Sequence, residues 1–366
     1  MEKRNCFIDD LTREAADIED IERRFGKKLS CASKGRFGIY HILLSLKREQ
    51  KYANGYVMIP IYACSSIPWV IKKAGYDVCY YDICESDLNG DLESIKKIYQ
   101  RTQSKILLIP SLYGNPANLL EIEEYCREND IFMIDDAAQA FGAMLDGRMV
   151  GSFGDAGLFS FSAGKPTYGH MGCFYWSGEN QSNTKTRHLI YHIIEYVNFF
   201  YNRYADYNSK KLYRISIINY FKIFMYKLID ISYDDLYPFE KKVLLRVINS
   251  NFLSWKEERI RVIDNIKEMT NESVLRVVTA EKGEPNNNKI VFVVKDVRLA
   301  TELIHFLRNH NCYCSPGYQL LEDTNKDSFP VAYNLYKRIV EIPITASKEK
   351  NNITINAIAQ WLQACI

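Results

Sequence analysis

An acidic residue and a lysine, each placed after an apolar segment, are the features of this sequence best suited to chemistry. Asp136 follows the apolar run IFMI and precedes AAQA, where a helix is predicted to begin, and Lys165 lies in the glycine-rich stretch GLFSFSAGKPTYGHMG. Taken singly, Asp136 is typical of a helix N-cap and Lys165 of a surface turn. Together they offer a carboxylate and an amine to one ligand, and Ser160 adds a hydroxyl close to the lysine.

Pyridoxal 5′-phosphate (PLP) requires this combination of groups. Its aldehyde is held as a Schiff base by a lysine whose amine must be deprotonated to react, and its pyridine nitrogen stays protonated beside a carboxylate. Its phosphate binds backbone N–H groups at a glycine turn that opens a helix, together with hydroxyl donors. The stretch SKGRFGIYHILL offers such a turn at Gly35 and Arg36, and Ser160 offers a hydroxyl.

Strands and helices alternate from residue 36 to about residue 176, and these elements would position the chemical groups. The periodicity of apolar residues predicts helices over 36–50, 65–75 and 118–130, and strands over 56–62, 78–83, 105–114 and 131–136. Helices of this length between strands imply parallel βαβ units. The segments PIYACSS, PSLYGN and DDAAQA then follow the carboxyl ends of strands, where such sheets bind ligands.

The alternation stops at residue 177. Residues 177–255 are predicted to form a helical insertion rich in aromatic and basic residues, because eight Lys and Arg lie between Lys185 and Lys227 against only Glu195 and Asp206. This composition is also typical of interfacial helices, so weak contact with a membrane surface through residues 185–230 stays an open alternative.

Helices and short strands return from residue 256. Helical patterns cover 254–269, 297–310 and 353–366, and strand patterns cover 273–280 and 289–295. A chain of 366 residues is long enough for one large and one small domain. We therefore predict an α/β fold with a mostly parallel sheet in a large domain over 1–255 and a smaller α+β C-terminal domain over 256–366.

The overall composition argues against several function classes. The 47 Lys and Arg are balanced by 45 Asp and Glu, so no global charge favours nucleic acid. The ten cysteines form no CxxC pair and the start MEKRNCFIDD has no signal-like apolar run, so we expect reduced thiols in a cytoplasmic protein. The six histidines show no metal-site spacing, so we expect no metal.

The run FMIDDAAQAFGAMLDGRMVGSFGDAGLFSFSAGKP resembles the signature of the DegT/StrS family of PLP-dependent sugar aminotransferases. The similarity continues upstream in GRFGIYHIL, VMIPIYAC and LIPSLYGNPANLLEI, and downstream in FPVAYNLYKRIVEIPI. The resemblance covers about residues 30–176 and 255–366. It implies fold type I of the PLP-dependent transferases and a homodimer.

The resemblance also implies roles for individual residues. Lys165 would form the Schiff base with PLP and shuttle a proton during catalysis, and Asp136 would pair with the pyridine nitrogen. Gln139 would lie near the phenolic oxygen of the cofactor. The remaining cofactor-binding residues are those of the phosphate site, Gly35, Arg36 and Ser160, and Cys64.

Several positions depart from the family pattern, among them Phe37-Gly38, which replaces a small residue plus alanine, and Cys173, which stands where a second glycine is usual after Gly172. Lys34 precedes Gly35 where the family usually has serine, and Cys64 stands where an aromatic ring commonly stacks on the cofactor. Tyr62 and Tyr113 are candidates to replace that ring. In the family, a segment of the neighbouring subunit contributes an asparagine to the phosphate site. In this chain the long insertion replaces or displaces that segment.

The predicted activity is transfer of an amino group from an amino acid, with glutamate favoured, to a nucleotide-linked keto-sugar, for surface polysaccharide or amino-sugar biosynthesis. Two alternatives stay open. One is a PLP-dependent sugar dehydratase, although dehydratases of this kind carry histidine in place of the lysine. The other is a cofactor-poor relative that acts as a regulatory, partner-binding or membrane-surface protein.

Overall fold

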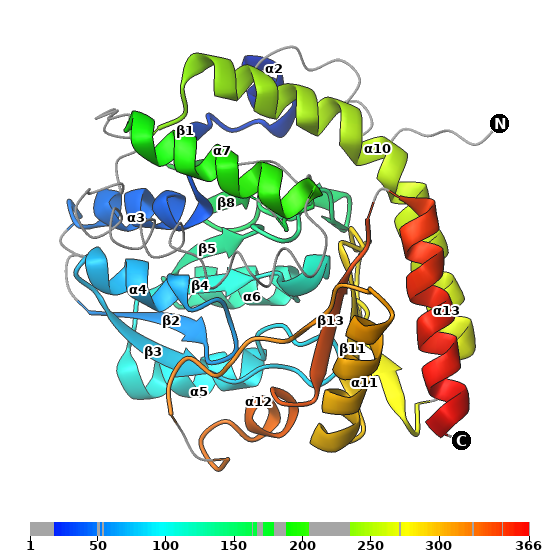
Figure 1. Cartoon of the computed structure of the whole chain (residues 1–366). Helices are drawn as coiled ribbons and strands as arrows, with labels where there is room; N and C mark the ends of the chain where they lie inside the picture. The colour runs from blue at the N-terminus through cyan, green and yellow to red at the C-terminus, as the bar shows by residue number, and fades with distance from the viewer. Residues whose placement is uncertain are drawn as a thin grey trace.

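A seven-stranded sheet forms the centre of the computed structural model, with strand order β1-β9-β8-β5-β4-β2-β3 (Figure 1). Its strands are β1 (Ser30–Ala32), β2 (Tyr56–Pro60), β3 (Asp77–Tyr81), β4 (Ile106–Pro110), β5 (Phe132–Asp136), β8 (Ala156–Ser160) and β9 (Cys173–Ser177). Within the sheet, β9 runs antiparallel to β8 and β1, and the other pairings are parallel. The structure describes residues 18–49, 52, 55–162, 164–166, 171–178, 188–204, 235–270, 272–323, 326–345 and 347–365.

Helices cover both faces of this sheet, which explains why its central strands are apolar throughout. Alternate residues of β4 belong to opposite hydrophobic clusters: Ile106 and Leu108 pack on one face, and Leu107 and Ile109 pack on the other. The helices around the sheet are α2 (Ile18–Phe25), α3 (Gly35–Leu46), α4 (Ser66–Lys73), α5 (Leu92–Thr102), the short 3₁₀ helix η2 (Leu112–Gly114), α6 (Leu119–Glu128) and α7 (Leu189–Tyr204).

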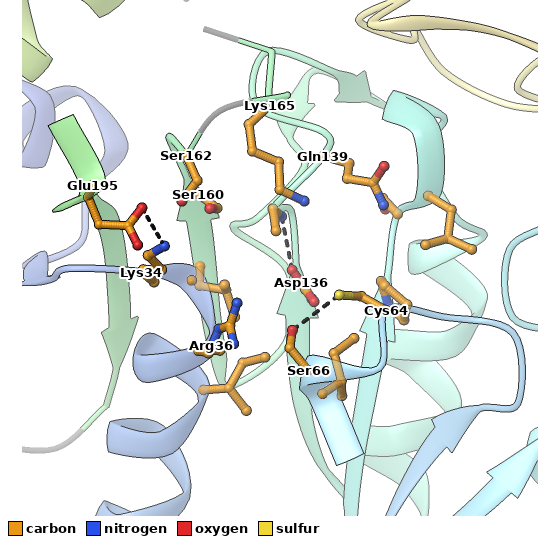
Figure 2. A pocket seen from close by; sticks show the side chains of 18 residues that line it. Lys34, Arg36, Cys64, Ser66, Asp136, Gln139, Ser160, Ser162, Lys165 and Glu195 are labelled. Carbon is orange, nitrogen blue, oxygen red and sulfur yellow. Dashed lines mark hydrogen bonds and ion pairs between the residues drawn. The ribbon is translucent and has the colours of Figure 1, made fainter. Parts of the chain in front are cut away.

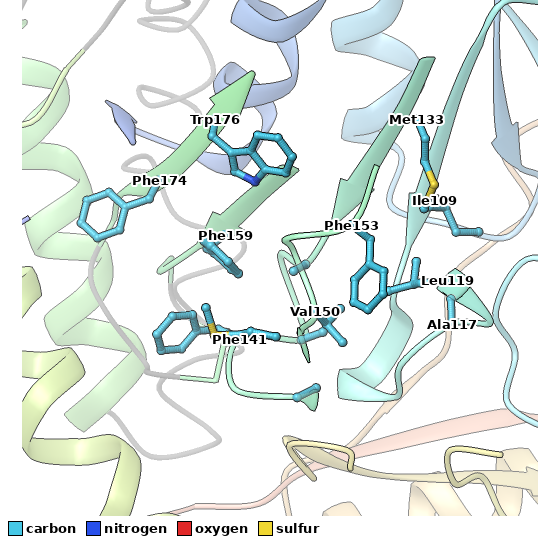
Figure 3. Packing of buried hydrophobic residues seen from close by; sticks show 14 of the residues in the cluster. Ile109, Ala117, Leu119, Met133, Phe141, Val150, Phe153, Phe159, Phe174 and Trp176 are labelled. Atoms are coloured by element: carbon cyan, nitrogen blue, oxygen red, sulfur yellow. The ribbon is translucent and has the colours of Figure 1, made fainter. Parts of the chain in front are cut away.

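The two faces carry different helices. Side chains of α3 and α4 join the cluster that contains Leu108, and side chains of α5 and α6 join the cluster that contains Leu107. Figure 3 shows the second cluster, where Phe141, Phe159 and Phe174 pack near the short hairpin of β6 (Met144–Leu145) and β7 (Arg148–Met149). The helix α3 lies against β8 and β9 so closely that a side chain at Gly38 would place its Cβ 2.7 Å from the Cys173 sulfur.

A second, four-stranded antiparallel sheet lies toward the C-terminus, with strand order β10-β11-β13-β12. Its elements are β10 (Leu275–Val277), β11 (Lys289–Val294), α11 (Val297–Asn309), β12 (Ser315–Pro316), α12 (Pro330–Leu335), β13 (Ile339–Pro343) and α13 (Lys348–Cys365). The long helix α10 (Pro238–Met269) packs its last turns against this sheet and beside α13 (Figure 1).

The fold class predicted from the sequence is confirmed, and the helices and strands predicted over stated residue ranges are found with adjusted ends. The strand predicted over 105–114 ends at Pro110 and is followed by η2, and the helix predicted from 254 begins 16 residues earlier, at Pro238. The predicted boundary between residues 255 and 256 falls inside α10 and stays a prediction. Of the predicted insertion, residues 179–187 and 205–234 lie outside the described residues.

No helix in the described part of the chain combines the length and the apolar character that a membrane span needs. The exposed residues of α7 nevertheless include several apolar side chains: Leu189, Ile190, Ile193 and Val197.

Adjacent aspartates at the end of β5 point to opposite faces of the sheet, as the two-residue period of a strand requires. The fully buried Asp135 accepts hydrogen bonds from the backbone N–H groups of Gly151, at 2.6 Å, and Phe153, at 3.1 Å. These bonds fix the turn that leads into β8. Asp136 is left to face the opposite side, where the loops after the strands meet.

Asp135 gives the fold a pH dependence whose sign follows from its burial. Burial raises the pKa of Asp135 to about 8. The folded chain therefore keeps a proton that the unfolded chain releases near pH 4, so the free energy of unfolding falls as the pH rises from about 4 to about 8. The variant Asp135→Asn keeps an oxygen acceptor for both N–H groups and removes the titration. Urea unfolding at several pH values should show a shallower decline for the variant than for the wild type, and parallel pH profiles would contradict this assignment.

Candidate active site

A cavity of about 290 Å³ opens at the carboxyl ends of β4, β5 and β8 and at the first turns of α3 and α4 (Figure 2). Its walls come from the three loops singled out in the sequence, together with the turn that carries Lys165 and with α7. The seven predicted site residues all line it: Gly35, Arg36, Cys64, Asp136, Gln139, Ser160 and Lys165.

Lys165 extends from a turn after β8 into this cavity (Figure 2). Its backbone N–H donates to the Ser162 carbonyl at 3.1 Å, and Gly164 before it has a φ of 81°, which a glycine adopts without strain. Burial lowers the pKa of the Lys165 ammonium, while the nearby Cys64 sulfur and Asp136 carboxylate partly oppose that effect. A lowered pKa increases the fraction of the neutral, nucleophilic amine at neutral pH.

Asp136 lies across the cavity from this turn and is only 5% exposed. Its Oδ1 accepts a hydrogen bond at 2.9 Å from the backbone N–H of Ala138, two residues ahead. The helix predicted to begin after Asp136 is wrong: residues 137–142 form consecutive turns, and the carboxylate closes a turn where an N-cap was expected. Burial raises the pKa of Asp136, and the positive charge of Lys165 partly counteracts this rise.

The turn around Lys165 is held by residues from the C-terminal part of the chain that sequence reasoning missed. The guanidinium of Arg259, on α10, donates to the Pro166 carbonyl and, at 3.5 Å, to the Asn286 carbonyl. The Asn288 side chain donates to the Gly164 carbonyl at 3.5 Å. Arg259 is 1% exposed and shares the buried face of α10 with Val262, Ile263 and Ile266. A charged residue at helical spacing with these apolar residues was the signal that could have identified it.

Gln139 connects the cavity to the second sheet. Its Nε2 donates to the Tyr318 hydroxyl at 3.1 Å, and the Tyr318 backbone N–H donates to the Tyr62 hydroxyl at 3.1 Å. Tyr62 and Tyr113 share a hydrogen bond of 2.5 Å between their hydroxyls in the hydrophobic cluster under this junction. Neither Tyr62 nor Tyr113 lines the cavity, whereas Cys64 does, with its sulfur 3.1 Å from the Ser66 hydroxyl. The tyrosines considered as replacement stacking partners therefore join the two parts of the fold instead.

The opposite end of the cavity is rich in hydrogen-bond donors. Gly35 opens α3 so close to β8 that a Cβ on it would lie 3.0 Å from the Ser160 Cβ and 3.2 Å from its hydroxyl oxygen. The first N–H groups of α3 have no acceptor within the helix. Two further charged residues that were not predicted as site residues line this end, Lys34 and Glu195. The departure of Lys34 from the family pattern was the available signal for the first, and nothing in the sequence marked the second.

A metal centre finds no support among the described residues, where no group of three or more His, Cys, Asp or Glu side chains converges as metal ligands would.

A family model and several known proteins match parts of this sequence. The model of the DegT/DnrJ/EryC1/StrS aminotransferase family matches residues 40–359. A GDP-4-keto-6-deoxy-D-mannose 3-dehydratase from Yersinia pseudotuberculosis is 29% identical over 146 residues, 39% of this chain and 37% of that protein. A GDP-perosamine synthase from Escherichia coli O157:H7 is 28% identical over 155 residues, 40% of this chain and 41% of that protein. The matched part thus spans about two fifths of each relative.

The solved structures include similar folds over nearly the whole chain. The E. coli GDP-4-keto-6-deoxy-D-mannose-3-dehydratase with bound hydrated PLP superimposes with a TM-score of 0.67 and 18% identity, over 97% of this chain and 92% of that chain.

The hydrogen bonds from Arg259 to the Lys165 turn and to Asn286 lead to a prediction about stability. The variant Arg259→Met keeps much of the apolar stem but leaves the Pro166 and Asn286 carbonyls without the guanidinium. We expect it to lower the free energy of unfolding by about 2–3 kcal/mol, the usual loss for buried hydrogen bonds to a charged donor. Chemical denaturation measures the change.

A matched control lies two residues along the same helix. Arg261 forms a more exposed ion pair of 2.7 Å with Glu258, so Arg261→Met should change the free energy of unfolding by less than about 1 kcal/mol. Equal losses of unfolding free energy in the two variants would show that the Arg259 hydrogen bonds do not stabilise the Lys165 turn.

Proposed function

Because this chain belongs to the DegT/DnrJ/EryC1/StrS aminotransferase family, we propose that it is a PLP-dependent aminotransferase that acts on nucleotide-linked keto-sugars. The amino group would come from an amino acid, with glutamate the favoured donor, and the product would serve amino-sugar or surface polysaccharide biosynthesis. The observation that carries the proposal is the convergence of Lys165 and Asp136 in one cavity.

The residues present fit PLP at both ends of the cofactor. The family and the PLP-bound relative indicate this cofactor. An amine and a carboxylate face the same cavity, and the opening of α3 at Gly35 leaves room beside Ser160 that a larger residue would fill. Donors from a helix N-terminus and from hydroxyls are the groups that bind a phosphate. We propose Gly35, Arg36 and Ser160 as phosphate-binding residues, and Cys64 as a residue beside the ring.

When bound, PLP supplies an electron sink that stabilises negative charge on the carbon next to the transferred nitrogen. Lys165 would hold the cofactor, and its amine would also move a proton to and from that carbon. Its lowered pKa suits the role, because the amine must accept a proton near neutral pH. Asp136 would hold the proton on the pyridine nitrogen, and this positive partner would favour the ionised carboxylate despite its burial.

Gln139 is positioned to orient the ring. Its bond to Tyr318 fixes the amide, and Tyr318 is in turn held by the Tyr62 hydroxyl. The remaining hydrogen-bonding capacity of the Gln139 amide is therefore directed by groups from both sheets, and we propose that it faces the phenolic oxygen of the ring.

The two curated relatives differ in reaction, since one is named a dehydratase and the other a perosamine synthase. Lys165 favours transamination. Dehydratases of this kind carry histidine at the position of the lysine, whereas the chain here keeps a primary amine that can both attach the cofactor and relay protons. We further propose a homodimer, as the resemblance implies, and two domains that meet at α10.

The decisive variant is Lys165→Ala. The wild type should acquire the yellow absorbance of lysine-bound PLP and lose it when an amino acid donor is added. The variant should show neither change, and transamination should fall by at least about 10²–10⁴-fold, the usual contribution of a positioned acid–base group. Product analysis by mass spectrometry after incubation with glutamate and GDP-linked or dTDP-linked keto-sugars separates an amino-sugar from a deoxygenated sugar. A wild type that never binds PLP would overturn the proposal.

A further inference from the structure

The charged residues at the donor-rich end of the cavity form an ion pair between two distant parts of the chain. Lys34 precedes α3, and its Nζ lies 2.9 Å from the Glu195 carboxylate on α7 (Figure 2). The side chains are 15% and 3% exposed. Lys34 occupies the N-cap position of α3 without capping the helix through its side chain. Its side chain is instead directed to the cavity, which both partners line.

The groups around this pair are donors suited to an anion. Ser160 is 3% exposed and lines the cavity, and within the described residues its hydroxyl has no hydrogen-bond partner. The first N–H groups of α3, at Gly35 and Arg36, have no acceptor within the helix, and the positive end of the helix dipole lies there. Glu195 is thus the anion that this part of the protein itself supplies.

The low exposure of the Lys34 side chain favours an anionic partner for its ammonium group. An ammonium group removed from water costs several kcal/mol unless an anion faces it. Glu195 meets this need, and an entering phosphate would meet it with a larger charge and with further bonds to the hydroxyl and N–H donors. Glu195 and a phosphate group would repel each other across the same small space.

We propose that Lys34 is a ligand of the cofactor's phosphate and that Glu195 competes with the phosphate for the Lys34 ammonium. This inference rests on the proposed function and deepens it, because it assigns phosphate recognition to a lysine outside the pattern of the family. It also gives α7 a role, since the helix supplies the competing carboxylate and so lowers the affinity for phosphorylated ligands.

The test compares the equilibrium binding of PLP, of pyridoxal, which lacks the phosphate, and of inorganic phosphate. Fluorescence or absorbance titration follows the first two, and calorimetry follows the third. Lys34→Met should weaken PLP binding by about 10- to 100-fold, the range for a lost charge-assisted hydrogen bond, and should change pyridoxal binding by less than about twofold. Glu195→Gln should tighten the binding of PLP and of inorganic phosphate by about three- to tenfold, again without affecting pyridoxal.

Two controls keep the test interpretable. Because Lys34→Met removes the ammonium that faces the buried Glu195, the double variant Lys34→Met with Glu195→Gln removes both charges. Its loss of PLP affinity relative to Glu195→Gln must be at least as large as the loss of Lys34→Met relative to the wild type, since Glu195 no longer competes for Lys34. Lys241→Met breaks another ion pair, of 3.1 Å to the buried Asp235, that does not line the cavity. It should leave the ratio of PLP to pyridoxal affinity unchanged.

The outcomes separate this inference from the proposed function. If Lys34→Met weakens the binding of PLP and of pyridoxal equally, or if Glu195→Gln does not tighten PLP binding, the inference is wrong. The cofactor assignment then stays intact. If the binding of inorganic phosphate depends on Lys34 and Glu195 but the protein never binds pyridoxal or PLP, the result supports competition between Glu195 and phosphate for Lys34. The proposed function is then wrong.

Discussion

Adjacent parallel strands place two ionisable groups of opposite charge, the Lys165 amine and the Asp136 carboxylate, at one cavity. The other contacts of the site depend on this placement. Because β5 and β8 run in the same direction, their carboxyl ends deliver Asp136 and the Lys165 turn to the same edge of the sheet. Burial shifts the pKa of each group toward its neutral form. Each partner opposes the shift of the other, so their proximity limits the cost of keeping both groups in the interior.

The position of the amine is set from outside its own sheet. Two side chains hold the turn that carries Lys165: Arg259 donates to its Pro166 carbonyl and Asn288 donates to its Gly164 carbonyl. Tyr318 binds Gln139 on the opposite wall. These residues all lie in the C-terminal third of the chain, so the second sheet and α10 complete the site by ordering residues of the first. Under the proposed function, these contacts between the two parts of the fold would supply the precise placement that proton transfer demands.

The sequence allowed the fold class, the parallel strands and seven residues that line the cavity to be predicted, because these features depend on local periodicity and on motifs with fixed spacing. The contacts of Arg259 with Pro166 and of Lys34 with Glu195 join residues more than 90 positions apart, and no local pattern encodes such pairings. The turn after Asp136 was mistaken for a helix because AAQA has high helix propensity. The Asp136 carboxylate, bonded to the Ala138 N–H, and the packing of the Phe141 ring among buried aromatic residues override that preference.

Two departures from the family pattern line the cavity, Cys64 near Lys165 and Lys34 at the donor-rich end. Near Lys165 and Asp136 the cavity holds the amine and the carboxylate that PLP requires, whereas the donor-rich end carries Lys34 where the family usually has serine, paired with Glu195 of α7. Catalytic groups tolerate little change, because each acts on a particular atom of the ligand. A phosphate site tolerates more, since any set of converging donors stabilises the same charge. Under the proposed function, a change at that end would therefore adjust the affinity for the phosphate while Lys165 and Asp136 stay in place.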